Sequence, residues 1–225
     1  MEKNKTGKYL KYAIGEIILV VIGILIALSI NNWNETQKLI KNEKELITSL
    51  KKEIANNILE LESSIEMNIK FIETAEKLIH SLKLKNDLFS ANQIYSSFDY
   101  FPYKVNSPVL DRIIATNSNL LIEKKELLAG FRLLKNSYFR IANNQFYLDE
   151  FWNSKVTNFL IASGVWAEDE DIDYQITLKE LALDGYSKKQ FMTMIKIHKA
   201  LHNFWKNSKV DATEKSKEIL NILNE

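Results

Sequence analysis

The longest apolar stretch of the chain, Ile17 to Ile30, contains no charged side chain. Extending it back to Tyr9 gives about 22 residues, or roughly 33 Å of helix, which is long enough to cross a bilayer. Lysines precede the stretch, and Trp33 follows it among asparagines. Basic and aromatic residues are typical of the two membrane interfaces. The pattern predicts a transmembrane signal-anchor helix over residues 12–33, preceded by a basic tail over residues 1–11.

The residues that flank this helix predict its orientation. Lys8 and Lys11 on one side and Trp33 on the other are the expected interfacial anchors. Positive charge before the helix favours a cytoplasmic N-terminus, with the body in the periplasm and the helix in the inner (cytoplasmic) membrane. A cleaved signal peptide is the alternative, because Ala27 and Ser29 resemble a processing site. The helical pattern continues past Trp33 without a breaker, which favours the anchor.

One stripe of the predicted anchor helix combines an acidic residue with small residues. A step of 100° per residue places six residues on this stripe: Ala13, Glu16, Val20, Gly23, Ala27 and Ile30. Small residues let two membrane helices approach closely. The face therefore either packs against another transmembrane helix, with Glu16 bonded across the contact, or places Glu16 at the cytoplasmic interface, within reach of Lys8 or Lys11. The sequence leaves both interpretations open.

After the anchor, residues 35–85 have the periodicity of one long amphipathic helix. Its apolar residues recur at steps of three, four and seven: Leu39, Leu46, Leu50, Ile54, Ile58, Leu61, Ile65, Ile72, Ile79 and Leu82. A kink at Asn56-Asn57 would let the helix fold back on itself. A straight helix would show the same periodicity, so the sequence leaves both possibilities open. The stripe could also meet a partner chain as a coiled coil. We expect it to pack on later helices of the same chain, because they too have wide apolar faces.

The region between residues 86 and 107 is irregular and aromatic. Phe98, Tyr100, Phe101 and Tyr103 surround Pro102, and such clusters more often close the end of a bundle than form a recognition loop. Ser107 and Pro108 are an N-cap followed by proline at the first helical position. They predict a short helix over residues 108–116.

Three further helices are expected, over residues 123–162, 187–206 and 211–224, the last capped by Asp211. The first carries an aromatic face, which we interpret as core, with a ligand pocket as the alternative. That face is Leu127, Phe131, Leu134, Tyr138, Ile141, Gln145, Leu148, Trp152 and Phe159, widened by Phe139, Phe146 and Phe151. The predicted fold class is all-α: an N-terminal transmembrane helix continues into a long amphipathic helix, followed by an extracytoplasmic helical bundle within residues 34–225.

Two stretches carry a resemblance to a known group of proteins. The run KYAIGEIILVVIGILIALSINNWNE, from Lys11 to Glu35, resembles the N-terminal signature of an uncharacterised family of single-pass bacterial membrane proteins common in Bacteroidota. Phe101 to Tyr138 resembles the same family's central pattern of an aromatic-proline turn, a short helix, a polar turn and a long helix. The resemblance implies an anchored helical domain of unknown function and no mechanism.

Composition narrows the possible functions. The 30 basic and 29 acidic residues nearly balance, which argues against a nucleic-acid partner. The chain has no cysteine, so it has neither disulfides nor thiolate metal sites. Six glycines and two prolines are too few for a turn-rich β fold. One helical domain after the anchor is the simplest organisation.

Three patterns suggest chemistry, and each is incomplete. Residues 169–180 resemble an EF-hand calcium loop, with candidate ligands Asp169, Asp171, Asp173 and Glu180. Tyr174 occupies the position that requires glycine, so we expect no metal site. His198 and His202 have the spacing of two zinc ligands but lack the adjacent glutamate of metalloproteases, and Ser49 with Lys52 matches a chance spacing in a lysine-rich helix. We expect no catalytic residue and no cofactor.

These observations predict a non-enzymatic, membrane-anchored scaffold or interaction subunit of the bacterial envelope. Its expected partners are the lipid bilayer and either another protein or a second copy of the chain. An extracytoplasmic sensory or ligand-binding bundle is the alternative. A pilin-like assembly subunit is a third possibility, because Glu16 precedes IILVVIGIL, but Lys11 occupies the position where a prepilin has its processing glycine.

Overall fold

The protein is described by a computed structural model that covers residues 5–84, 88–99, 101–116, 125–163, 165, 175–177, 179–180 and 187–224. The chain divides into two compact units, Met1–Ser49 and Leu50–Glu225. The described elements are α1 (Lys5–Lys83), β1 (Leu88–Ser90), α2 (Ala91–Ser96), α3 (Pro108–Thr116), α5 (Lys125–Phe151), the π-turn η1 (Trp152–Val156), α6 (Thr157–Ala162), β2 (Gln175–Thr177) and α8 (Lys188–Asn224). The predicted all-α class is confirmed, with one short ribbon added.

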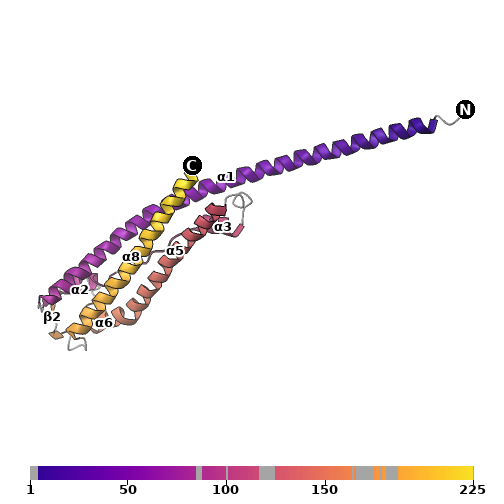
Figure 1. The fold of residues 1–225 in the computed structure, drawn as a ribbon. Helices are drawn as coiled ribbons and strands as arrows, with labels where there is room; N and C mark the ends of the chain where they lie inside the picture. The colour runs from indigo at the N-terminus through magenta and orange to yellow at the C-terminus, as the bar shows by residue number, and fades with distance from the viewer. Residues whose placement is uncertain are drawn as a thin grey trace. The chain divides into compact units, whose positions relative to one another are not determined.

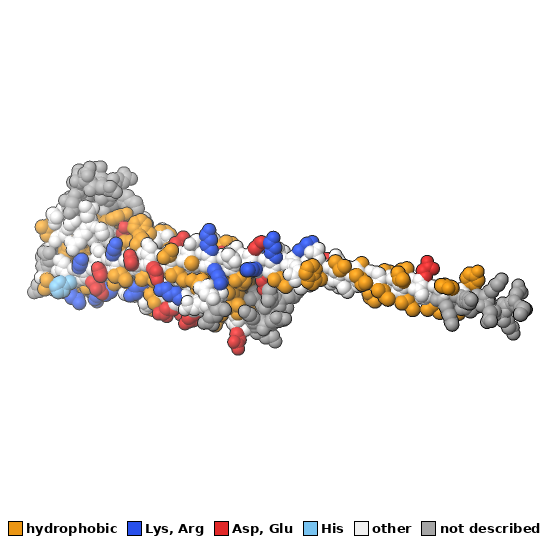
Figure 2. All heavy atoms as spheres, turned by 90° about the horizontal axis from the view of Figure 1, so that it is seen from above, with side chains coloured by type: hydrophobic (Ala, Val, Ile, Leu, Met, Phe, Trp, Pro, Cys, Tyr) orange, Lys and Arg blue, Asp and Glu red, His pale blue; other side chains and the backbone are white. Residues whose placement is uncertain are grey.

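Helix α1 is uninterrupted over 79 residues. The predicted anchor segment and the predicted amphipathic helix are therefore one helix, and Asn56-Asn57 does not break it. In the first unit its apolar side chains are exposed and gather on the surface (Figure 2). The predicted apolar stripe becomes buried only from Leu50 onward, and Leu39 is exposed.

Residues 50–83 of α1 form a three-helix bundle with α5 and α8 (Figure 1). Helix α8 runs antiparallel to α1, because Glu62 pairs with Lys217 and Glu76 pairs with Lys199. It is also antiparallel to α5, where Arg140 pairs with Asp211 and the Asn144 side chain donates to the Phe204 carbonyl. The expectation of an intramolecular bundle is confirmed for this part of α1.

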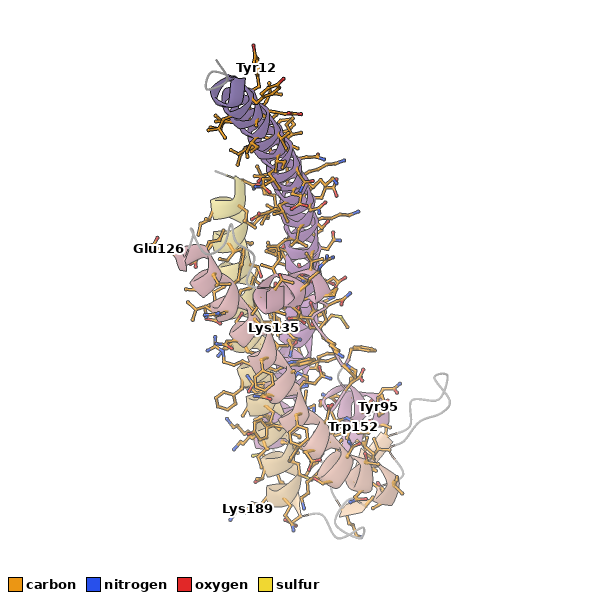
Figure 3. All side chains as sticks on the ribbon, turned by 90° about the vertical axis from the view of Figure 1, so that its right-hand side faces the viewer. Tyr12, Tyr95, Glu126, Lys135, Trp152 and Lys189 are labelled. Atoms are coloured by element: carbon orange, nitrogen blue, oxygen red, sulfur yellow. The ribbon has the colours of Figure 1, made fainter. Side chains whose placement is uncertain are left out.

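One end of the bundle is closed by a two-stranded antiparallel ribbon of β1 and β2, with Phe89 opposite Ile176. The ribbon, α2 and α6 bury an apolar cluster that includes Phe98, Phe159 and Phe191. Tyr95 and Trp152, both labelled in Figure 3, pack against this cluster, and Trp152 Nε1 donates to the Phe98 carbonyl at 2.9 Å. The prediction that the aromatic segment closes the end of the bundle is thus confirmed for Phe98, whereas Phe101 is exposed.

The C-terminal region differs from the prediction. Residues 187–206 and 211–224 were expected to be two helices, whereas α8 is a single helix of 37 residues. No glycine or proline lies between them, and the backbone continues because its apolar face stays buried against α5. Asp211 is therefore no N-cap and instead pairs with Arg140 and Lys215. The predicted start is correct, since Ser187 and Gln190 form a capping box.

The predicted helix over residues 123–162 is present with two differences. A π-turn separates α5 from α6, and the Thr157 hydroxyl donates to the Trp152 carbonyl there. Phe139 and Phe146 were assigned to the core face, but the structure leaves them exposed. The core stripe, including Phe131 and Leu148, is already wide enough to fill the bundle.

The short helix α3 matches its predicted bounds but is capped differently. The Glu53 carboxylate of α1 accepts from the backbone N–H groups of Val109 and Leu110, at 2.7 and 3.0 Å. The Ser107 hydroxyl instead accepts from Lys135 at 3.1 Å. An anion at a helix N-terminus satisfies free N–H groups and interacts favourably with the helix dipole.

Candidate functional site

Lys209 lies in the interior of the bundle and is 0% exposed. Its Nζ donates to Ser64 Oγ at 2.7 Å and to Asn68 Oδ1 at 2.5 Å. The same atom lies 3.1 Å from the centroid of the Trp205 ring, a favourable cation–π position. Among the described residues, no carboxylate pairs with it. Burial lowers the pKa of Lys209 to about 7, because the interior disfavours the charged form.

Asn68 connects this ammonium group to a buried histidine. Its Oδ1 faces Lys209, since an ammonium group only donates. Its Nδ2 therefore faces the other way, where it lies 3.0 Å from Nδ1 of His202. The amide must donate there, so His202 Nδ1 is the acceptor and the neutral ring carries its proton on Nε2. The orientation of one amide thus fixes the tautomer of His202.

His198 extends the chain of polar groups toward the apolar end of the bundle. Its ring meets that of His202 edge to face, with centroids 4.6 Å apart, and bonds to the Ser97 backbone. Burial lowers the pKa of His198 to about 4. Burial lowers the pKa of His202 further, assisted by His198 and Lys209. Both rings are neutral at pH 7.

Helical periodicity explains why these groups meet. His198, His202, Trp205 and Lys209 follow steps of four, three and four, which keeps them on one face of α8. Ser64 and Asn68 are one turn apart on α1 and face that stripe. We call the buried residues Asn68, His198, His202, Trp205 and Lys209, together with the half-buried Ser64, the polar seam.

A groove lies beside the polar seam. Its volume is about 460 Å³, and it is lined by Leu59, Glu60, Ser63, Ser64 and Met67 of α1 and by Phe101, Pro102 and Tyr103. Ser64 therefore has one side in the groove and the other on Lys209. The Tyr103 ring lies 5.5 Å from Lys209 Nζ.

The segment that forms the other wall of the groove is held on both sides. Trp152 holds the Phe98 carbonyl, and the backbone N–H of Tyr103 donates to Gln145 Oε1 at 2.9 Å. The Phe101 ring lies 6.0 Å from that of Phe71 on α1. The wall is thus fixed to α1 and α5, and the groove that it borders is largely open to solvent.

The structure describes the residues of the predicted transmembrane face. They make no contact that would test whether this face packs against another helix. Glu16, Val20 and Ile30 are exposed, and a Cβ added to Gly23 would meet nothing within 4 Å. Trp33 is also exposed. The side chains of Lys8 and Lys11 are not among those that the structure describes. By length and composition, α1 could cross a membrane.

The metal candidates are only partly described. Asp169, Asp171 and Asp173 lie outside the described residues. The Glu180 carboxylate accepts from the backbone N–H and hydroxyl of Thr177, at 2.6 and 2.7 Å, which is a capping arrangement. His198 and His202 do meet, but no group of three metal-ligating side chains occurs among the described residues.

The most unusual residues of the site escaped the sequence analysis. Lys209 and Asn68 were not singled out, because a predicted break between residues 206 and 211 removed Lys209 from any helix. A signal was present: Lys209 continues the apolar register of Phe191, Ile195 and Trp205. A lysine on the buried face of a long helix points to a buried charge.

Residues 16–198 match a family of unknown function, DUF6090. The chain therefore belongs to this family, which confirms that the resemblance is to an uncharacterised group. No curated protein matches the chain. No solved structure matches it either.

Proposed function

We propose that this protein is a non-enzymatic, single-pass membrane-anchored interaction subunit of the bacterial envelope. One observation carries the proposal: in the first unit, α1 is apolar, exposed and long enough to cross a membrane. Exposed apolar surface of this extent needs lipid or protein around it. The Bacteroidota resemblance of residues 11–35 supports an envelope location, with the bundle in the periplasm.

The anchor helix would contact its partner through the stripe of Ala13, Glu16, Val20, Gly23, Ala27 and Ile30. In hydrocarbon, helices associate by close packing of small residues and by polar contacts. An acidic residue within the membrane favours a bonded position. The partner is either another transmembrane protein or a second copy of this chain.

The test is the mass and composition of the complex extracted gently from the native membrane. Gly23→Leu and Glu16→Leu should each remove a second polypeptide or reduce the homo-oligomer to a monomer. Gly15→Leu is the matched control, because Gly15 is equally open but lies off the stripe. An unchanged complex in Gly23→Leu and Glu16→Leu would refute the contact.

A ligand-binding or sensory bundle is a second candidate function. The polar seam favours it, since an ammonium group buried beside an open groove, with no carboxylate partner among the described residues, is costly to keep in a purely structural core. Buried polar groups with shifted pKa values cluster at functional sites. A small molecule that raises the melting temperature of the full-length protein would support this function.

A further inference from the structure

The groove beside the polar seam presents an oriented hydrogen-bond donor. The Ser64 oxygen accepts from Lys209 Nζ. Among the described residues, the Ser64 hydroxyl donates to nothing, whereas Thr48, Ser49 and Thr74 on the same helix donate to carbonyls four residues earlier. Its proton is therefore available to an acceptor in the groove, and the ammonium group behind it makes it a stronger donor.

The same groove carries a carboxylate one helical turn away. Glu60 lines the groove, and residues four apart on a helix have Cβ atoms about 5–6 Å from each other. Among the described residues, Glu60 forms no salt bridge. Burial and, after it, the negative charge of Glu60 raise the pKa of Tyr103, which places the carboxylate near that ring.

Most of the other residues that line the groove are apolar. Leu59, Met67, Phe101 and Pro102 line it, and Leu59 and Phe101 are exposed. Aromatic and aliphatic side chains around a few polar groups are characteristic of small-molecule sites, and 460 Å³ falls in their usual range of about 300–1,000 Å³. The groove thus offers an acceptor for a cation, a donor for an anion and an apolar surface between them.

We propose that the groove binds a small zwitterion with an apolar side chain, of the α-amino acid class. Its carboxylate accepts from the Ser64 hydroxyl above Lys209, its ammonium group donates to Glu60, and its side chain packs on Met67 and Phe101. The ammonium group meets the Glu60 carboxylate and the carboxylate meets a hydroxyl that is itself bonded to Lys209, whereas a simple amine or a simple acid satisfies only one of the two positions. The inference names the ligand of the second candidate function and does not depend on the anchor.

The test uses full-length protein in detergent micelles and three probes with the same side chain. Leucine carries both charges, 4-methylpentanoate lacks the amine, and 3-methylbutylamine lacks the carboxylate. Isothermal titration calorimetry should give an affinity for leucine at least about tenfold greater than for either analogue, because losing one charge-assisted hydrogen bond weakens binding by that order.

Two variants locate the binding. Ser64→Ala should weaken leucine binding by about tenfold or more, and Glu60→Gln should do the same. Ser63→Ala is the matched control: Ser63 lines the same groove but is not bonded to Lys209, so binding should change less than about twofold. Circular dichroism would show that each variant keeps its helices.

Several results would overturn the proposal. One is no heat with leucine at millimolar concentration, and another is equal affinity for leucine and 3-methylbutylamine. Equal losses in Ser63→Ala and Ser64→Ala would exclude the oriented hydroxyl. Because complex formation is measured separately with Gly23→Leu, failure here leaves the interaction-subunit proposal standing, and the reverse also holds.

Discussion

The two halves of α8 face the bundle with different chemistry. Toward its start, Phe191 and Ile195 are fully buried against Phe98 and Phe159, with the Phe159 and Phe191 rings stacked at 5.2 Å. From His198 onward, the same face buries two imidazoles and one ammonium group. The first half supplies hydrophobic stabilisation, whereas the second keeps ionisable groups where their charged forms are disfavoured.

The apolar half of α8 thus stabilises the bundle, whereas the polar half supplies the groups that could act chemically. An apolar core of the same volume would often be as stable as a buried polar network or more stable. The polar half also contains hydroxyls that bond to their own helix, as Ser208 does to Trp205 and Thr213 does to Lys209. These hydroxyls bond to carbonyls of α8 itself. The bonds that join the polar half to α1 are those of Lys209 to Ser64 and Asn68.

The largest effect is expected in the apolar half. Phe98→Ala should lower the free energy of unfolding by about 3–5 kcal/mol, through lost burial and the cavity left among Phe159 and Phe191. Chemical denaturation of the full-length protein in micelles measures it. Phe204→Ala is the control, since Phe204 is 65% exposed and should cost less than about 0.5 kcal/mol. Equal losses would mean that the apolar cluster is not the main core.

The next effect tests the charge of Lys209. The folded-state pKa of Lys209, about 7, lies below the ordinary lysine value of 10.5, so between these pH values the unfolded chain binds more protons. Stability should therefore rise from pH 7 to 9, by up to about 1.4 kcal/mol per pH unit. Lys209→Met should remove this slope. A wild-type stability that is flat over this window would show that the ammonium group is not destabilised by burial.

A second pH dependence, over a narrower range, is expected on the acid side. Because burial lowers the pKa of His198 from 6.5 to about 4, the unfolded chain binds a proton in this range that the folded chain excludes. Stability should fall as the pH drops from 6.5 toward 5, at up to about 1.4 kcal/mol per unit. His198→Phe should reduce this slope relative to wild type. An identical slope in both proteins would mean that groups other than His198 cause the loss of stability in acid.

The smallest effect concerns one buried hydrogen bond near the C-terminal end of the bundle. Tyr138 and Ser216 lie 2.9 Å apart through their hydroxyl oxygens. Tyr138→Phe should cost about 1 kcal/mol, because it removes the hydroxyl that bonds to Ser216 and Asn57 without leaving a cavity. A double-mutant cycle with Ser216→Ala should show that the two changes are not additive. Additive losses would mean that the two hydroxyls do not interact.

Much of the architecture could be predicted because it depends on local rules. Apolar periodicity identified α1, α3 and the long helix that includes α5, and the Ser107-Pro108 pair gave the bounds of α3. The ribbon of β1 and β2 was missed because each strand has three residues, too few for an alternating pattern to be recognised. Its pairing joins residues almost 90 positions apart.

The sequence by itself determined most of the long helices, the apolar N-terminal segment and the absence of thiol chemistry, because periodicity, length and residue type are local properties. Only the tertiary structure decided which polar side chains meet. Ser64 and Asn68 reach Lys209 across more than 140 residues, and Glu53 caps a helix 56 residues away. Helix periodicity fixes which face a residue occupies, but not which face of another helix lies opposite, and this pairing creates the polar seam and its groove.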